Sequence, residues 1–165
     1  MSEALVHPDG RLVFRGQVFQ AALGRGGVRA DKQEGDGATP SGHLPLRRVL
    51  YRADRESPPR CVLPIEPIAP DDGWCDDPAS PDYNRMVRLP NTASHEELWR
   101  QDGQYDIVGV LGWNDAPVRP GRGSAIFLHV AAPDFSPTAG CIALTAADLR
   151  TLLAAGVTEL FVLGG

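Results

Sequence analysis

The strongest structural signal in the sequence lies in residues 124–144, which read SAIFLHVAAPDFSPTAGCIAL. In its first part, Ile126, Leu128 and Val130 alternate with Phe127 and His129, and a period of two residues is typical of a β-strand with two different faces. The two prolines that follow favour a stiff loop over a continued strand. We therefore predict a strand, a loop that turns back, and a second short apolar segment after the loop.

Further apolar runs on either side of this stretch predict more strands. Residues 11–23 have the pattern of two short strands joined near Arg15 and Gly16. Residues 43–51 and residues 157–163 each predict a strand, and a continuous apolar run from Ile107 to Leu111 is typical of a strand that is buried on both faces.

Two short helices complete the predicted elements. Ser94 and Glu97 have the spacing of a capping box, so we expect a helix at about residues 95–100. An apolar stripe at helical spacing follows Thr145, so we expect a second helix at about residues 146–155.

The composition fits a single, mainly β domain that spans residues 1–165. The chain has 165 residues, of which 42% are hydrophobic, and this is enough for one sizeable core. Its 18 glycines and 15 prolines are too many for a helical bundle. The net charge of −5 argues against a nucleic-acid-binding protein, and no apolar run is long enough to cross a bilayer.

Residues 52–90 form a long segment rich in proline, aspartate and arginine. A loop of this length in a compact domain is more often a functional cover than a simple connection. We expect short extended pieces around Val62 and Met86, and we interpret Trp74 as part of the wall of a cleft.

Cys141 and His129 form a candidate catalytic pair. A thiol with a pKa of about 8.5 is mostly protonated at neutral pH, and a neighbouring imidazole can accept its proton to give a nucleophilic thiolate. Gly140 leaves space for a substrate carbonyl, and the N–H groups of Gly140, Cys141 and Ala139 could stabilise the oxyanion of an acyl transfer. For the two side chains to meet, the loop between His129 and Cys141 must turn back.

Both residues also have a structural interpretation. A buried cysteine often serves as a small hydrophobic side chain, and a histidine on a strand is often a hydrogen-bonded core residue. Of the other two cysteines, Cys75 has no basic neighbour in the sequence and Cys61 is interpreted as structural, so Cys141 is the preferred nucleophile. No cysteine lies in a zinc-binding spacing, and we expect neither a metal nor a cofactor.

Three motifs follow one another along the chain: GDGATPSG at residues 35–42, AIFLH at residues 125–129 and TAGCIAL at residues 138–144. In this order they resemble the L,D-transpeptidase (YkuD-type) catalytic domain, and the similarity spans about residues 10–164. The resemblance implies a β-sandwich or barrel fold with short helices. It also implies a cysteine acyltransferase that cleaves an L,D peptide bond in peptidoglycan stem peptides and passes the acyl group to an amine.

By motif matching, the resemblance assigns Cys141 as the nucleophile, His129 as the general base and Gly140 as part of the oxyanion hole. Either Asp134 or a backbone carbonyl would orient the imidazole. Asn114 would either orient the substrate or cap a turn.

The sequence differs from the family pattern at three positions: Thr138 replaces a common serine, Ala139 a histidine and Ala143 an arginine. We expect Thr138 to contact the substrate. Arg119 or Arg122 would supply the cation for a substrate carboxylate, unless both belong to an ordinary solvated loop.

Two alternatives to the transpeptidase remain. Water could resolve the thioester, which would make the chain an L,D-carboxypeptidase or a related amidase with the same Cys141 and His129 pair. The changes at Ala139 and Ala143 favour a third interpretation, a non-catalytic peptidoglycan-binding module.

The resemblance implies peptidoglycan stem peptides or muropeptides as partners and a location in the periplasm or cell envelope. The first residues have neither a basic region nor an apolar core of the kind found in signal peptides. Either a leader is missing from the sequence, or export uses another route, or the substrate is a cytoplasmic precursor or recycled muropeptide; Met1 favours a complete chain. We expect a monomer.

Overall fold

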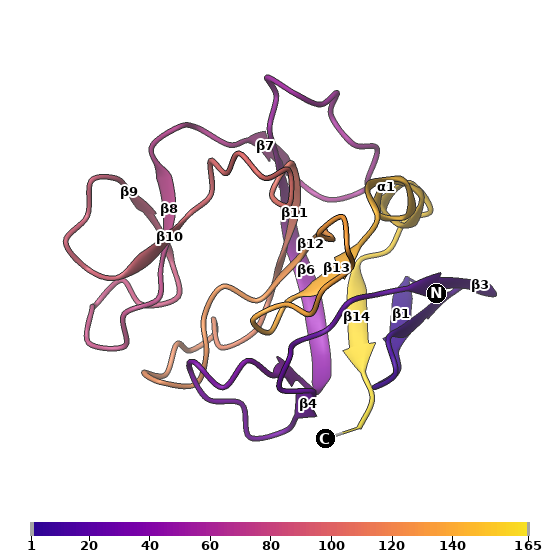
Figure 1. The fold of residues 1–165 in the computed structure, drawn as a ribbon, viewed down its shortest axis with the longest axis horizontal. Coiled ribbons are helices and arrows are strands. Elements are labelled where there is room, and N and C mark those ends of the chain that lie inside the picture. Colours follow the sequence, from indigo (N-terminus) through magenta and orange to yellow (C-terminus); the bar gives the residue numbers. More distant parts are fainter. Residues whose placement is uncertain (1, 165) are drawn as a thin grey trace.

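The computed structural model describes residues 2–164. The strands of its large sheet are β1 (Glu3–Val6), β2 (Arg11–Phe14), β3 (Gln17–Gln20), β6 (Gly42–Tyr51), β7 (Ile65–Pro67), β11 (Ile107–Leu111), β12 (Phe127–Val130), β13 (Ile142–Leu144) and β14 (Glu159–Val162). Within the described residues these nine strands follow the order β13-β12-β11-β6-β14-β1-β2-β3, and β7 pairs with β6 (Figure 1). The predicted mainly β fold is confirmed.

The large sheet curls until its two edges meet. Ala22, two residues after β3, exchanges backbone hydrogen bonds of 2.8 and 2.9 Å with Ala143 on β13. Because β3 and β13 are the edge strands, this bridge gives the sheet the form of a nearly closed barrel.

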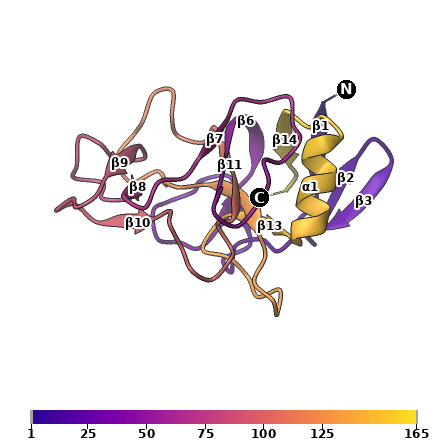
Figure 2. The same cartoon turned by 90° about the horizontal axis from the view of Figure 1, so that it is seen from above.

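Two small sheets lie outside the large one. The first consists of β8 (Asp72–Cys75), β9 (Met86–Arg88) and β10 (His95–Glu97) in the order β10-β8-β9, and the second of β4 (Val28–Arg29) and β5 (Thr39–Pro40). The three-stranded sheet lies at the opposite end of the molecule from β1, β2 and β3 (Figure 2).

The helix predicted at residues 146–155 is confirmed, and it is the only α-helix among residues 2–164. This helix, α1, spans Ala146–Ala154 and begins after Thr145, whose hydroxyl accepts the Asp148 N–H at 3.2 Å. Its apolar stripe is buried against the large sheet and consists of Leu149, Leu152 and Leu153.

The helix predicted at residues 95–100 is wrong. His95, Glu96 and Glu97 form β10 and pair with β8. The Ser94 hydroxyl, which would have capped the helix, donates instead to Asp76 at 2.6 Å. Pairing with a strand about twenty residues earlier therefore overrides the local capping signal.

The other predicted strands are all present. The N-terminal hairpin is β2–β3, and the strands predicted at residues 43–51, 107–111 and 157–163 are β6, β11 and β14. The hairpin turns at Arg15 and Gly16, which both have positive φ angles. Of the two extended pieces expected in the long segment, Met86 begins β9, whereas Val62 is exposed and precedes β7.

Two apolar clusters pack on opposite faces of β11 and β12. Ile126 and Leu128 belong to the first cluster, inside the curled sheet, together with the apolar stripe of α1. Phe127 belongs to the second cluster, which lies between the large sheet and β8 and also contains Trp74 and Leu98. The alternation predicted for β12 is therefore confirmed.

Candidate active site

Cys141 and His129 lie on the same face of the large sheet. β13 pairs in parallel with β12 and places Ile142 opposite Leu128. Cys141 therefore lies beside Phe127, whose backbone N–H donates to the cysteine Sγ at 3.3 Å. Because side chains alternate along strands, Phe127, His129 and Cys141 face one side of the sheet, while Leu128 and Ile142 face the other.

Both side chains line a pocket with a volume of about 430 Å³. Three parts of the chain form its wall: the glycine-rich segment that follows β3, the stretch from β8 to β11, and the region of β12 and β13. Of residues 52–90, the segment predicted to cover a site, only Asp76 lines the pocket, and the other wall residues of the stretch from β8 to β11 lie between positions 96 and 105. The charged groups in the wall are Arg25, Lys32, Glu34, Asp76, Glu96 and Arg100.

The thiol of Cys141 is almost completely buried and hydrogen-bonded on both sides. It donates to the Ala125 carbonyl at 3.2 Å and accepts the Phe127 N–H. Burial and, to a lesser extent, the negative charge of Glu96 raise the pKa of this thiol to about 12. At neutral pH the resting cysteine is therefore a thiol.

The imidazole of His129 is a neutral base. Its Nδ1 lies 2.9 Å from the Val130 carbonyl oxygen. A carbonyl can only accept, so Nδ1 carries the hydrogen and Nε2 keeps its lone pair. Burial lowers the pKa of His129 to about 4. A backbone carbonyl orients the ring, whereas Asp134 is exposed and accepts the Ser136 N–H.

The loop before Cys141 is held by the hydroxyl of Thr138. This hydroxyl donates to the Cys141 carbonyl at 2.7 Å and accepts the Gly140 N–H at 3.1 Å. The Gly140 amide is thus engaged within the loop, whereas the amides of Ala139 and Cys141 have no hydrogen-bond partner among residues 2–164. Gly140 has a φ of +134°, and a Cβ there would lie 2.8 Å from the Ala38 carbonyl oxygen.

The GDGATPSG turn braces the same loop. The hydroxyl of Thr39 accepts the Gly24 N–H at 2.9 Å and donates to the Cys141 carbonyl at 3.4 Å. Asp36 accepts the ammonium of Lys32 at 2.6 Å and the Ala38 N–H at 2.9 Å. Burial acts to raise the pKa of Asp36, but these hydrogen bonds outweigh burial and lower it. A charged carboxylate therefore stabilises the turn.

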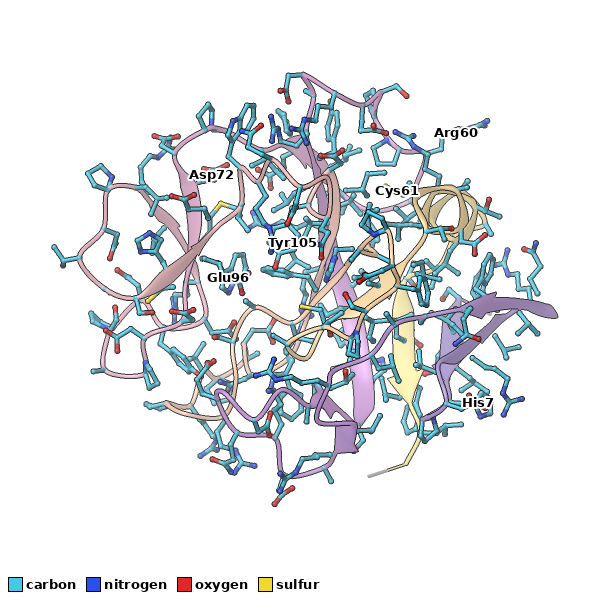
Figure 3. All side chains as sticks on the ribbon, in the orientation of Figure 1. His7, Arg60, Cys61, Asp72, Glu96 and Tyr105 are labelled. Atoms are coloured by element: carbon cyan, nitrogen blue, oxygen red, sulfur yellow. The ribbon has the colours of Figure 1, made fainter. Side chains whose placement is uncertain are left out.

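A polar group that the sequence analysis did not identify lies beside His129. The Tyr105 hydroxyl donates to Glu96 Oε1 at 2.6 Å (Figure 3), and the Tyr105 ring meets the imidazole edge-on at 5.2 Å. The guanidinium of Arg100 lies over the Tyr105 ring, 4.5 Å from the ring centre. Burial raises the pKa values of both Tyr105 and Glu96. No local pattern identifies this group, because its members converge only when β10 pairs with β8.

The residues expected to bind substrate do not all line this pocket. Thr138 does, but Arg119, Arg122, Asn114 and Trp74 are not among its lining residues. Asn114 caps a loop, because its side chain donates to the carbonyls of Arg119 and Gly123 and accepts the Arg119 N–H. The pocket instead contains the cations Arg25, Lys32 and Arg100, none of which a local motif identifies.

Trp74 is buried in the second apolar cluster, to which Cys141 also belongs, but it does not line the pocket. Its ring meets Phe127 edge-on at 5.1 Å, and its indole N–H donates to Asn84 at 3.0 Å. Through its contact with Phe127, Trp74 packs against β12, the strand that contains His129.

The described residues contain one group of side chains close enough to share a metal ion. It consists of Glu3, His43 and Glu159, on β1, β6 and β14, and none of them lines the pocket with Cys141. Among residues 2–164, no helix has the length and apolar character required to span a membrane.

Comparison with known proteins places the chain in a family. A solved structure, that of the helical cell shape determining protein Pgp2 from Campylobacter jejuni, shares 14% sequence identity with the chain at a TM-score of 0.47. The alignment covers 97% of this chain and 46% of that one, so the chain spans less than half of the Pgp2 structure. No curated protein sequence matches. The model of the L,D-transpeptidase catalytic domain, YkuD, matches residues 2–157, and the chain therefore belongs to this family.

Proposed function

We propose that the chain is a cysteine acyltransferase that cleaves an L,D peptide bond in peptidoglycan stem peptides and transfers the acyl group to an amine. The observation that carries the proposal is the shared pocket of Cys141 and His129, in which the free lone pair of Nε2 belongs to a neutral imidazole. Family membership supports peptidoglycan as the substrate and the cell envelope as the place of action.

In the first half-reaction, His129 Nε2 accepts the proton of the Cys141 thiol, and Sγ attacks the carbonyl carbon of the L,D bond. The oxyanion that forms receives hydrogen bonds from the amides of Cys141 and Ala139; one such donor is worth about 3 kcal/mol in the transition state. The imidazolium returns its proton to the leaving amine, the C–N bond breaks, and a thioester remains.

In the second half-reaction, an acceptor amine attacks the thioester carbonyl and gives a proton to Nε2 of His129. The C–S bond then breaks, and the sulfur regains the proton as the Cys141 thiol. Water in place of the amine would give an L,D-carboxypeptidase, and product analysis with and without an amine acceptor separates the two.

We further propose that Arg25 supplies the cation for a substrate carboxylate. It lines the pocket, is exposed, and forms no ion pair with any residue from 2 to 164. The other two cations of the pocket already have acidic partners, since Lys32 pairs with Asp36 and Arg100 with Asp102.

A non-catalytic peptidoglycan-binding module is the second candidate function. The buried thiol of Cys141, with its pKa raised to about 12, is the observation that favours it. An enzyme must form the thiolate when substrate binds, whereas a binding module never does.

The experiment that decides is incubation with a disaccharide tetrapeptide followed by mass spectrometry of the intact protein. We expect an acyl adduct on Cys141 that is absent from Cys141→Ala and from His129→Ala. Cys75→Ala is the matched control, because Cys75 is also free and buried but does not line the pocket. Binding without an adduct in the wild-type protein would favour the non-catalytic module.

A further inference from the structure

A second cavity, with a volume of about 280 Å³, is bounded by β6 and β11 of the large sheet and by β8 and β9 of the small one. Its floor is apolar and is formed by Trp74, Met86, Val110 and Leu111. It shares no lining residue with the pocket that contains Cys141. Ligand cavities typically combine such an apolar lining with a few polar groups at fixed positions, and a cavity of this size suits a compact molecule.

Three guanidinium groups line this cavity, which we call the arginine cavity: those of Arg47, Arg48 and Arg85. Among residues 2–164, the one carboxylate in its wall is that of Asp115, which accepts Arg47 Nε at 3.0 Å and Nη2 at 3.2 Å. Arg48 pairs at 2.8 Å with Glu66, which lies outside the wall. The wall therefore carries an excess of positive charge, although the whole chain has a net charge of −5.

A shift in strand register brings two consecutive arginines to the same cavity. Neighbouring side chains on a strand normally point to opposite faces. The pairing of β6 with β11 shifts by one residue after Val110, so that β6 contains Arg47 as an extra residue. Leu46 and Val49, which flank the two arginines, both lie in the core inside the curled sheet, so Arg47 and Arg48 share the outer face. Bulges of this kind redirect side chains and are frequent beside functional sites.

Arg85 is the guanidinium that is most available to a ligand. It is exposed, and its side chain forms no hydrogen bond or ion pair with any residue from 2 to 164. The preceding residue, Asn84, is 6% exposed and holds this segment in place. Its side chain accepts the Trp74 indole N–H at 3.0 Å and donates to the Trp113 carbonyl at 2.9 Å. The backbone at Arg85 is therefore ordered before a ligand binds, which lowers the entropic cost of binding.

We propose that the arginine cavity binds an organic anion with an aromatic body and a carboxylate or phosphate head. The body lies on the apolar floor, where the Trp74 indole and the Met86 thioether make favourable contacts with an aromatic ring. The head pairs with Arg48 and Arg85, because guanidinium groups bind carboxylates and phosphates through two parallel hydrogen bonds. This site is separate from the acyl transfer proposed at Cys141 and does not depend on it.

Calorimetric titration with four probes distinguishes the parts of the ligand that the cavity recognises. Naphthalene-2-carboxylate and 2-naphthyl phosphate present the same aromatic body with each of the two heads. Naphthalene-2-carboxamide has the shape of the carboxylate without its charge, and acetate has the charge without the aromatic body. We expect the tighter of the two naphthyl anions to bind about tenfold more strongly than the carboxamide, which corresponds to roughly 1.4 kcal/mol, and acetate to show no measurable binding.

Arg85→Gln should weaken binding of the tighter anion about tenfold and leave binding of the carboxamide unchanged, because it removes a charge and little of the apolar wall. Arg48→Gln should act in the same direction. Arg88→Gln is the matched control, since Arg88 is exposed on β9 and does not line the cavity. Arg25→Gln, in the pocket with Cys141, should also have no effect.

Equal affinities for the naphthyl anions and the carboxamide, or unchanged affinity in Arg85→Gln, would overturn the anion site. A loss of affinity in Arg25→Gln would place the anion beside Cys141 and would overturn it as well. Binding of acetate as tight as that of naphthalene-2-carboxylate would contradict recognition of an aromatic body. None of these results bears on the Cys141 acyl adduct, which tests the proposed function separately.

Discussion

Thr39 shows how one side chain connects the glycine-rich turn to the nucleophile. It is completely buried, and its single hydroxyl serves both the Gly24 N–H and the Cys141 carbonyl. Valine has nearly the same shape but no hydroxyl, so it would leave both backbone groups buried without this partner.

Thr39→Val should therefore lower the free energy of unfolding by about 1–3 kcal/mol, the usual cost of a buried polar group left unsatisfied. Urea unfolding of the wild-type and variant proteins measures the difference. Thr92→Val is the control, because Thr92 is exposed, and it should change the stability by less than about 0.5 kcal/mol. Equal losses for the two variants would contradict this role of Thr39.

His129 makes stability depend on pH. Its pKa falls from an ordinary 6.5 to about 4 because burial disfavours the charged ring. Between these pH values the unfolded chain binds a proton that the folded protein does not, so this contribution to stability is fully present at pH 7 and is lost as the pH falls from about 6.5 to about 4.

The expected loss is roughly 3 kcal/mol over that interval. Unfolding by urea at a series of pH values measures it, and His129→Gln should flatten this part of the curve. A variant with the same slope as the wild-type protein would show that the imidazole is not the group that titrates.

Among the elements, α1 has a start that a single side chain, the N-cap residue Thr145, predicts. The Thr145 hydroxyl accepts the Asp148 N–H, and the three leucines of the helix are buried against the large sheet. The cap and the apolar stripe are both local patterns, so the predicted helix agrees with the observed one.

Thr145→Ala should destabilise the protein by about 1 kcal/mol, because it removes the cap. Thermal unfolding followed by circular dichroism measures this loss. Thr151→Ala is the matched control: Thr151 is an exposed residue of the same helix, where alanine has the higher helix propensity, so no loss is expected. A greater loss for Thr151→Ala would contradict the capping role.

At the scale of the whole molecule, the site depends on the packing of the small sheet against the large one. The second apolar cluster fills the space between them, and Leu98 is a completely buried member of it. The residues of the pocket wall on either side of Leu98, Glu96 and Arg100, keep their places only while this cluster is intact.

Leu98→Ala should cost about 2–5 kcal/mol by opening a cavity in the cluster. It should also increase amide hydrogen exchange in residues 95–105, measured by mass spectrometry, before the large sheet is affected. Leu5→Ala is the control, since Leu5 is 39% exposed on β1 and its loss should be much smaller. Uniform exchange throughout the Leu98→Ala protein would show that the two sheets unfold as one unit.

The sequence predicted most of the large sheet because its strands carry their own apolar periods. The alternation in residues 126–130 even assigned the correct face to Ile126, Leu128 and Val130 on one side and to Phe127 on the other. The helix expected at residues 95–100 failed because its capping pattern is equally compatible with a strand, and only a partner strand distinguishes the two. The same error concealed Glu96 and Arg100, which a helix would have placed on its surface.

The sequence by itself determined the alternation of the strands and the cap and stripe of α1, because each depends on residues within one turn or a few positions. It also proposed one cysteine and one histidine as a candidate pair. Only the tertiary structure decided which charges surround the thiol, whereas the carbonyl that orients the imidazole belongs to the next residue, Val130. Those charges come from segments about forty to more than one hundred residues away from Cys141, and the free energy of such contacts depends on burial and pairing that no local pattern records.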